Sequence, residues 1–263
     1  MKLFIIKKRS LIIFILIFFI VVLLFSYFAF KSIPTSTVEL NYDCIISEEI
    51  KNKIQSLVKG EEKIAYLTFD DGPNPSITPK VLDILKEESI KATFFVIGKN
   101  VDSYPDIVKR AYDEGHYIAN HGYDHNNKHL YQNDESFINE VKNTDIAIGK
   151  AIGVENYCAH IFRFPNGFMS PGNKSKKKEA VSLLSKMNYV YIDWNCLNND
   201  SVKKYSNSQL LNNLKKSSKN KNTLVILMHD TKDVSNSSLV LEDSIEYLKS
   251  QGYTFANFYD LLR

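Results

Sequence analysis

Histidines and carboxylates occur in this chain at spacings that suit a catalytic metal. His121 and His125 lie four residues apart, and Asp70 and Asp71 are adjacent. Two histidines and one carboxylate form a common ligand set for a catalytic divalent metal, with one position left for water. His121, His125 and one of the two aspartates therefore predict a metal site, in which the ion would polarise a carbonyl oxygen and lower the pKa of a bound water.

The remaining polar residues would complete a hydrolase. The aspartate that does not bind the metal would be free to act as general base, and His229 is available to protonate a departing amine. Arg163 would hold the base ionised through a charge-assisted pair. Each motif also has a simpler structural interpretation, because Asp-Asp-Gly-Pro is typical of a turn and paired histidines occur by chance on surfaces. We interpret Asp124, between the two histidines, as lying outside the ligand set.

From Lys63 onward, short apolar runs alternate with helical patterns. The strand-like runs are 64–69, 93–97, 117–120, 160–164, 189–193, 223–228 and 253–256. The predicted helices are 79–88, 105–113, 134–151, 175–187, 207–218 and 237–250. This alternation indicates a parallel α/β sheet, but periodicity alone leaves open whether the sheet closes into a barrel or stays open and doubly wound.

The polar residues named above come at the ends of predicted strands. The strand ends in question carry Asp70 and Asp71, His121 and His125, Arg163, Asp193 and Trp194, and His229. Because parallel strands share one direction, their carboxyl ends meet on one rim, where barrel enzymes build their sites. We therefore expect the polar side chains of these segments to lie close together on this rim.

The N-terminus predicts a membrane anchor. Lys7, Lys8 and Arg9 precede an apolar run over 11–30, which is long enough for the roughly 30 Å of a bilayer core. The run is longer than a cleavable signal and lacks a small-x-small exit, so we predict an uncleaved signal anchor rather than a removed signal. The basic cluster should stay cytoplasmic. The expected organisation is cytoplasmic 1–9, transmembrane 10–30, extracellular stem 31–62 with a short helix near 47–58, and catalytic domain 63–263.

The overall composition is that of an ordinary globular protein. A net charge of +3 over 263 residues argues against nucleic-acid binding as the main task. Cys44, Cys158 and Cys196 are too widely spaced for a disulfide framework or a metal knuckle, so isolated thiols are expected. The basic run 174–178 predicts a solvated loop and the start of a helix. The alternative is that these lysines bind an anionic polymer of the cell wall.

Taken together, the motifs resemble the polysaccharide deacetylases of carbohydrate esterase family 4, the NodB-type domain. Five motifs of that family are matched in order, by TFDDGP at 68–73, HGYDH at 121–125, RFPNG at 163–167, DW at 193–194 and LMH at 227–229. The resemblance runs from Lys63 to the C-terminus. It implies a distorted (β/α)7 barrel and a hydrolase that removes N-acetyl groups.

The resemblance also implies a role for each site residue. It assigns Asp70 as general base; Asp71, His121 and His125 as metal ligands; Arg163 to orient the base; His229 as general acid tuned by Asp193; and Asn166, Trp194 and Leu227 as substrate-binding residues. The metal would be zinc, with cobalt as an alternative. Family members commonly carry Ser or Thr where this chain has Gly122, and the missing hydroxyl is expected to loosen the metal loop without removing a ligand.

The expected activity is hydrolysis of N-acetyl groups from N-acetylglucosamine in cell-wall peptidoglycan. The anchor would place a monomeric, single-pass enzyme beside the wall. The alternatives are another glycan, such as chitin oligomers, an exopolysaccharide or xylan, and a catalytically silent glycan-binding domain. The intact Asp70–Asp71 pair argues against both a silent domain and the muramic-acid-directed relatives, in which the second position is often altered.

Overall fold

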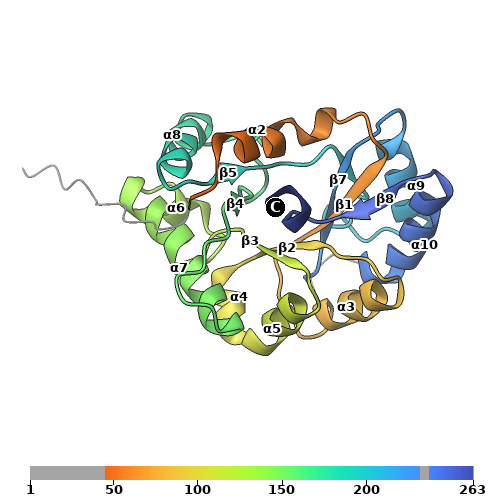
Figure 1. Cartoon of the computed structure of the whole chain (residues 1–263), viewed down its shortest axis with the longest axis horizontal. Coiled ribbons are helices and arrows are strands. Elements are labelled where there is room, and N and C mark those ends of the chain that lie inside the picture. Colours follow the sequence, from red (N-terminus) through yellow and green to blue (C-terminus); the bar gives the residue numbers. More distant parts are fainter. Residues whose placement is uncertain (1–44, 232–236, 263) are drawn as a thin grey trace, which may run out of the picture. The chain divides into compact units, whose positions relative to one another are not determined.

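The computed structural model describes residues 45–231 and 237–262 of the chain, and its centre is a parallel sheet. The strands are β1 Ile64–Asp70, β2 Thr93–Val96, β3 Tyr117–Asn120, β4 Ile161–Phe162, β5 Val190–Tyr191, β6 Cys196–Leu197, β7 Leu224–His229 and β8 Thr254–Ala256. They pair in the order β5-β4-β3-β2-β1-β7-β6, and β8 adds to β1. Because this path has β5 at one end and β6 at the other, the described strands form an open sheet, which curls into a half-barrel (Figure 1).

The helices surround this sheet on the outside, except the last one, which lies at the centre near the C-terminus (Figure 1). They are α2 Glu48–Ser56, α3 Thr78–Glu87, α4 Gly98–Ser103, α5 Pro105–Asp113, α6 Asn127–Leu130, α7 Asp134–Ile152, α8 Lys174–Lys186, α9 Asn207–Ser218, α10 Ser237–Ser250 and α11 Tyr259–Leu262, with a 3₁₀ turn at Leu57–Lys59. The longest, α7, begins where the Asn133 side chain accepts a hydrogen bond from the Ser136 N–H, and it ends at Gly153, which has φ 75°. These are the usual signals for helix start and stop.

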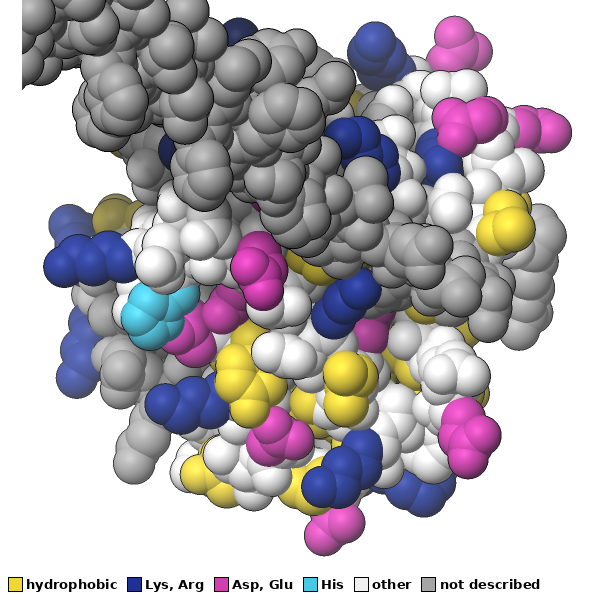
Figure 2. All heavy atoms as spheres, turned by 90° about the vertical axis from the view of Figure 1, so that its left-hand side faces the viewer, with side chains coloured by type: hydrophobic (Ala, Val, Ile, Leu, Met, Phe, Trp, Pro, Cys, Tyr) yellow, Lys and Arg dark blue, Asp and Glu magenta, His cyan; other side chains and the backbone are white. Residues whose placement is uncertain are grey.

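The α/β class and the parallel sheet predicted from periodicity are confirmed. Each predicted strand and long helix is present within a few residues of its expected bounds. The short elements β6, α4, α6 and α11 were not predicted. Figure 2 shows the face of α6, α7 and α8, where charged side chains of both signs are interspersed.

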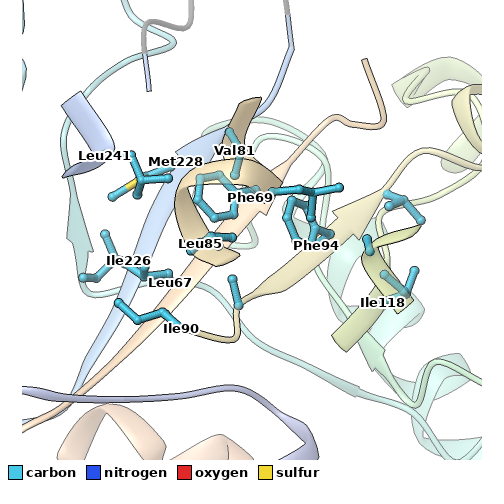
Figure 3. Close-up of a cluster of buried hydrophobic side chains, with 14 of the residues drawn as sticks. Leu67, Phe69, Val81, Leu85, Ile90, Phe94, Ile118, Ile226, Met228 and Leu241 are labelled. Carbon is cyan, nitrogen blue, oxygen red and sulfur yellow. The ribbon is translucent and has the colours of Figure 1, made fainter. Parts of the chain in front are cut away.

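Successive side chains of each strand point to opposite faces of the sheet, so the buried apolar residues form two separate clusters. On β1, Leu67 and Phe69 face outward and pack against Leu85 of α3 and Phe94 of β2 (Figure 3). Tyr66 faces the opposite side, because successive side chains of a strand point to opposite faces. There the inner cluster of Tyr66, Phe95, Tyr117, Val225 and Phe258 fills the interior of the curled sheet. Because apolar side chains fill this interior, a polar site can form only at the rim, where the carboxyl ends of the strands lie.

The cysteines differ from the expectation of isolated thiols. Cys196 is free and buried, as expected, but Cys158 is disulfide-bonded. The prediction was wrong for Cys158 because wide spacing in sequence does not report distance in the fold. The second cysteine of that bond lies outside the described residues. So do the predicted anchor 10–30 and residues 31–44 of the stem 31–62. Among the helices that are described, none is long and apolar enough to cross a membrane.

We expect the disulfide at Cys158 to contribute measurably to stability. Replacing Cys158 by Ser should lower the free energy of unfolding by about 2–5 kcal/mol, since a cross-link restricts the unfolded chain. Thermal unfolding with and without dithiothreitol checks this. The reductant should lower the Tm of the wild-type chain to that of Cys158→Ser and leave the variant unchanged; an unchanged wild-type Tm would contradict the bond.

Candidate active site

Asp71, His121 and His125 converge at the carboxyl end of the sheet. One Asp71 oxygen, Oδ1, lies 3.4 Å from Nε2 of His121 and 3.4 Å from Nε2 of His125. This oxygen is buried and accepts no hydrogen bond from any described residue. The three side chains offer ligand atoms that lie within 4.8 Å of one another. An orphaned carboxylate oxygen facing two imidazole nitrogens is the arrangement that a divalent cation would satisfy.

The protonation states of these groups also suit a metal. His121 Nδ1 lies 2.8 Å from the carbonyl oxygen of Arg163, so a neutral ring donates there and leaves the Nε2 lone pair free. Burial would raise the pKa of Asp71, but the contact with His121, 3.4 Å away, and the charge of that ring outweigh it and hold the pKa well below its usual value. Burial lowers the pKa of His125, which favours its neutral form. Burial would lower the pKa of His121, but the charge of Asp70 and the contact with Asp71 outweigh it and raise that pKa, so a binding cation would displace the proton from Nε2. The cluster therefore provides one carboxylate and two imidazoles to a cation.

Asp70 is held by a buried arginine beside this cluster. Its Oδ1 accepts a hydrogen bond of 2.8 Å from Arg163, and its Oδ2 lies 3.8 Å from Nε2 of His121. The Arg163 guanidinium is fully buried, donates also to Thr68 Oγ1 at 2.7 Å, and stacks 3.9 Å from the Phe95 ring centroid. The predicted pairing of Arg163 with Asp70 is thus present. Because Arg163 binds Oδ1 of Asp70, it is Oδ2 that faces His121.

His229 ends β7 directly opposite Asp70, because the two residues are register partners of β7 and β1. Its Nδ1 lies 2.7 Å from Asp200 Oδ1, and its backbone N–H donates to Asp200 Oδ2 at 2.8 Å. Burial would lower the pKa of His229, but Asp200, with smaller contributions from Asp70 and Asp71, raises it to about 9. The imidazole is therefore protonated at neutral pH and can donate a proton from Nε2.

Asp200 corrects the partner expected for His229. Sequence reasoning assigned Asp193 to tune this histidine, whereas the structure places Asp200 on its Nδ1. The Asp193 carboxylate instead accepts hydrogen bonds from the backbone N–H groups of Phe168, at 2.9 and 3.0 Å, and of Met169, at 3.3 Å. Asp193 therefore holds the turn that follows β4. Asp200 was missed because it follows β6, a strand of only two residues.

The same turn is held from its other side by Lys177. Its ammonium donates to the carbonyl oxygens of Gly167 at 2.8 Å, Phe168 at 3.3 Å and Ser170 at 3.1 Å. Lys177 is buried, so the solvated run expected over 174–178 is wrong at this position. A carboxylate that binds the N–H groups and an ammonium that binds the carbonyl groups together fix the turn beside the site.

Comparison with known proteins decides the family. The sequence profile of the family described as polysaccharide deacetylase matches residues 58–192. The chain belongs to the polysaccharide deacetylase family. It is 35% identical over 205 residues to a peptidoglycan-N-acetylglucosamine deacetylase of Bacillus cereus, with 76% of this chain and 71% of the relative covered. It is 31% identical over 202 residues to a peptidoglycan-N-acetylmuramic acid deacetylase of Bacillus subtilis, covering 77% and 72%.

A solved structure supports the same assignment for this polysaccharide deacetylase. The chain resembles a carbohydrate esterase family 4 esterase of Streptococcus mutans, with a TM-score of 0.70 and 30% sequence identity. The match covers 81% of this chain and 91% of that one. The resemblance noted in the five motifs is therefore confirmed, and this polysaccharide deacetylase is an enzyme with the curled α/β fold of its family.

Three expected substrate-binding residues of this deacetylase lie around the same rim. Asn166 is exposed in the turn after β4, with φ 65°. Trp194 is half-buried and packs against Gly167, where a Cβ would lie 2.7 Å from the ring. Leu227 lies on β7 and is 6% exposed. Their roles toward the oxyanion and the acetyl group stay predictions.

Substitutions of Asp200 and Asp193 should have different effects on the pH profile of activity, because only Asp200 contacts His229. A general acid with pKa about 9 is available below that pH and is lost as pH rises through it. In Asp200→Asn the pKa of His229 should fall toward the ordinary 6.5, so the alkaline limb of kcat/KM moves to lower pH and activity at pH 8 drops about 30-fold. Asp193→Asn should leave that limb in place and raise KM. A limb that moves with Asp193 instead would contradict the assignment.

Proposed function

We propose that this chain hydrolyses the N-acetyl groups of N-acetylglucosamine residues in peptidoglycan, with a divalent metal held by Asp71, His121 and His125. The observation that carries the proposal is the cluster of these three ligands beside the Asp70–Arg163 and His229–Asp200 pairs. An acid, a base and a metal site on one rim are what amide hydrolysis requires.

Zinc is the metal that this donor set favours. Two imidazole nitrogens and one carboxylate oxygen form an open ligand set, which catalytic zinc commonly uses, and cobalt accepts the same donors. When bound, the ion would polarise the acetyl carbonyl and lower the pKa of a water molecule. The orphaned Oδ1 of Asp71 fits this assignment, since it has no other partner among the described residues.

The side chains of the protein would move the protons. Asp70 takes a proton from the attacking water as a C–O bond forms at the acetyl carbon. His229 gives its Nε2 proton to the sugar nitrogen as the C–N bond breaks, which releases acetate and a free amine. The register pairing of Asp70 with His229 supports these two roles, because the two side chains lie on adjacent strand ends. The Asn166 N–H would help to hold the oxyanion, while Trp194 and Leu227 would line the pocket.

The proposed location is the outer face of the cell membrane, with segment 10–30 as a single-pass anchor, 1–9 inside, and 63–263 facing the wall on the stem 31–62. The apolar composition of the anchor supports this placement. The disulfide at Cys158 supports it independently, because such bonds persist in oxidising compartments. We propose that the enzyme acts there as a monomer.

The substrate can be tested directly with purified polymers. The zinc-loaded chain is incubated with peptidoglycan, chitin oligomers and acetylated xylan, and released acetate is measured. Mass spectrometry of the digested peptidoglycan then shows whether glucosamine or muramic acid has lost its acetyl group. We expect release from peptidoglycan at glucosamine. Release from another polymer alone would replace the proposed substrate. Stoichiometric zinc binding without release from any of them would indicate a different acetylated glycan, and no zinc binding at all would favour a silent domain.

A further inference from the structure

Two of the three proposed metal ligands have an unusual backbone conformation. Asp71 has φ 74° and His125 has φ 56°, both in the left-handed region. Residues with a Cβ rarely adopt this region, and they stay there only when their surroundings hold them. Both ligands also lie in loops rather than in strands or helices. The contacts made by these two loops should therefore determine how well the ligands are placed.

The start of α4 binds both loops, although it carries no ligand. The Asn100 side chain donates from Nδ2 to the Asp71 carbonyl at 2.9 Å. The N–H groups of Gly98 and Lys99 donate to the carbonyls of Gly122 and Tyr123, at 3.0 and 2.8 Å. One short segment after β2 thus joins the loop of Asp71 to the loop of His121 and His125.

The second loop is held from its other side by Glu140 of α7. One oxygen, Oε2, accepts hydrogen bonds from the backbone N–H groups of Tyr123, at 2.6 Å, and Asp124, at 3.1 Å. Glu140 is half-buried, and carboxylate acceptors make stronger hydrogen bonds than neutral ones. These two N–H groups belong to the residues immediately before His125. The carboxylate therefore limits the rotation of the peptide groups that lead into this ligand.

The loop does not need the hydroxyl that Gly122 lacks. Gly122 has φ 82°, its N–H donates to Asn120 Oδ1 at 3.0 Å, and its carbonyl accepts from Gly98. The amide of Asn120 is itself fixed by α7, since Nδ2 donates at 2.9 Å to both the Val141 carbonyl and Asp145 Oδ1. The loosening expected from Gly122 is therefore opposed by contacts from α7 and α4.

We propose that Asn100 and Glu140 are positioning residues for the metal, holding Asp71 and His125 in their left-handed conformations. This inference rests on the metal site of the proposed function. Neither side chain binds the ion. Each acts on the backbone of a ligand-bearing loop, so its loss should weaken metal binding while every ligand remains. Partners that orient ligands in this way typically contribute 10–100-fold to metal affinity.

Zinc affinity of the full-length chain tests the inference. The chain is stripped of metal, and its zinc Kd is measured by competition with a chromophoric chelator, well below the Tm of each variant. Asn100→Ala and Glu140→Ala should each raise the Kd by about 10–100-fold. Glu140→Gln keeps the size and an acceptor oxygen, so it should restore most of the affinity lost in Glu140→Ala. Asn100→Asp loses the donor and should behave like Asn100→Ala.

Ile148→Val is the matched control for general destabilisation. Ile148 is buried on α7 in the outer cluster and takes no part in the contacts that hold the two loops, so this variant should lower the Tm without changing the zinc Kd. Wild-type Kd values in both Asn100→Ala and Glu140→Ala would overturn the inference, as would an equal loss of affinity in Ile148→Val. Failure of the wild-type chain to bind zinc would instead contradict the metal assignment itself.

Discussion

Replacing Asp70 by Asn should reduce acetate release by about 10²–10⁴-fold while zinc binding is retained. The amide has nearly the same size but cannot take a proton from water. The metal ligands are untouched, because Asp70 Oδ2 lies 3.8 Å from His121 Nε2 and the closer carboxylate belongs to Asp71. Single-turnover release of acetate, with zinc content measured on the same sample, checks both parts.

The stability of this variant has to be measured with its activity. Asp70 is the ion-pair partner of Arg163, whose side chain is fully buried. Removing one member of a buried pair leaves an uncompensated charge and typically costs about 3–5 kcal/mol. We therefore expect Asp70→Asn to have a lower Tm than the wild type, so acetate release should be measured at a temperature well below the Tm of the variant. A folded, zinc-loaded Asp70→Asn that keeps activity within tenfold of wild type would contradict the role of Asp70 as base.

Replacing Asp71 by Ala should remove both zinc and activity. Its Oδ1 is the buried oxygen between the two histidines, so its loss leaves only two ligands. We expect the zinc Kd to rise by at least about 100-fold and acetate release to fall below detection at equimolar zinc. Zinc competition and acetate assays on the same preparation measure the two effects.

Asp124→Asn is the matched control for this change. Asp124 belongs to the metal loop and is acidic, but its Oδ1 accepts from the Asn126 N–H and its Oδ2 contacts His129. The amide keeps an acceptor oxygen for the Asn126 N–H. Zinc affinity and activity should therefore stay close to those of the wild type. An equal loss in Asp71→Ala and Asp124→Asn would indicate a general effect of loop charge rather than ligation.

The positions of Asp70, Asp71, His121 and His229 were predictable because each residue ends, or directly follows, a strand of four or more residues. Such strands are buried on both faces and leave a clear apolar run in the sequence. The direction of parallel strands then predicts that their ends meet, as the register of Asp70 with His229 confirms. Arg163 follows a strand of only two residues, β4, but it lies within the longer run 160–164 from which a strand was predicted.

Asp200 and Lys177 could not be found in this way. Asp200 follows a two-residue strand, whose apolar signal is too short to distinguish from a turn. Lys177 belongs to a run of lysines that is typical of a solvated helix start, and its burial depends on the turn it binds. Both depend on tertiary contacts between segments far apart in the chain. For the same reason Asp193, at a strand end beside Trp194, was assigned to the wrong partner.

A zinc titration of the metal-stripped chain, with acetate release from peptidoglycan as the signal, tests the central claim most directly. Activity should be absent without metal, rise with added zinc and saturate at one ion per chain, since one cluster of Asp71, His121 and His125 supplies the ligands. Release that persists at full strength in the stripped chain, or no release at one bound zinc per chain, would contradict metal-dependent deacetylation at this site.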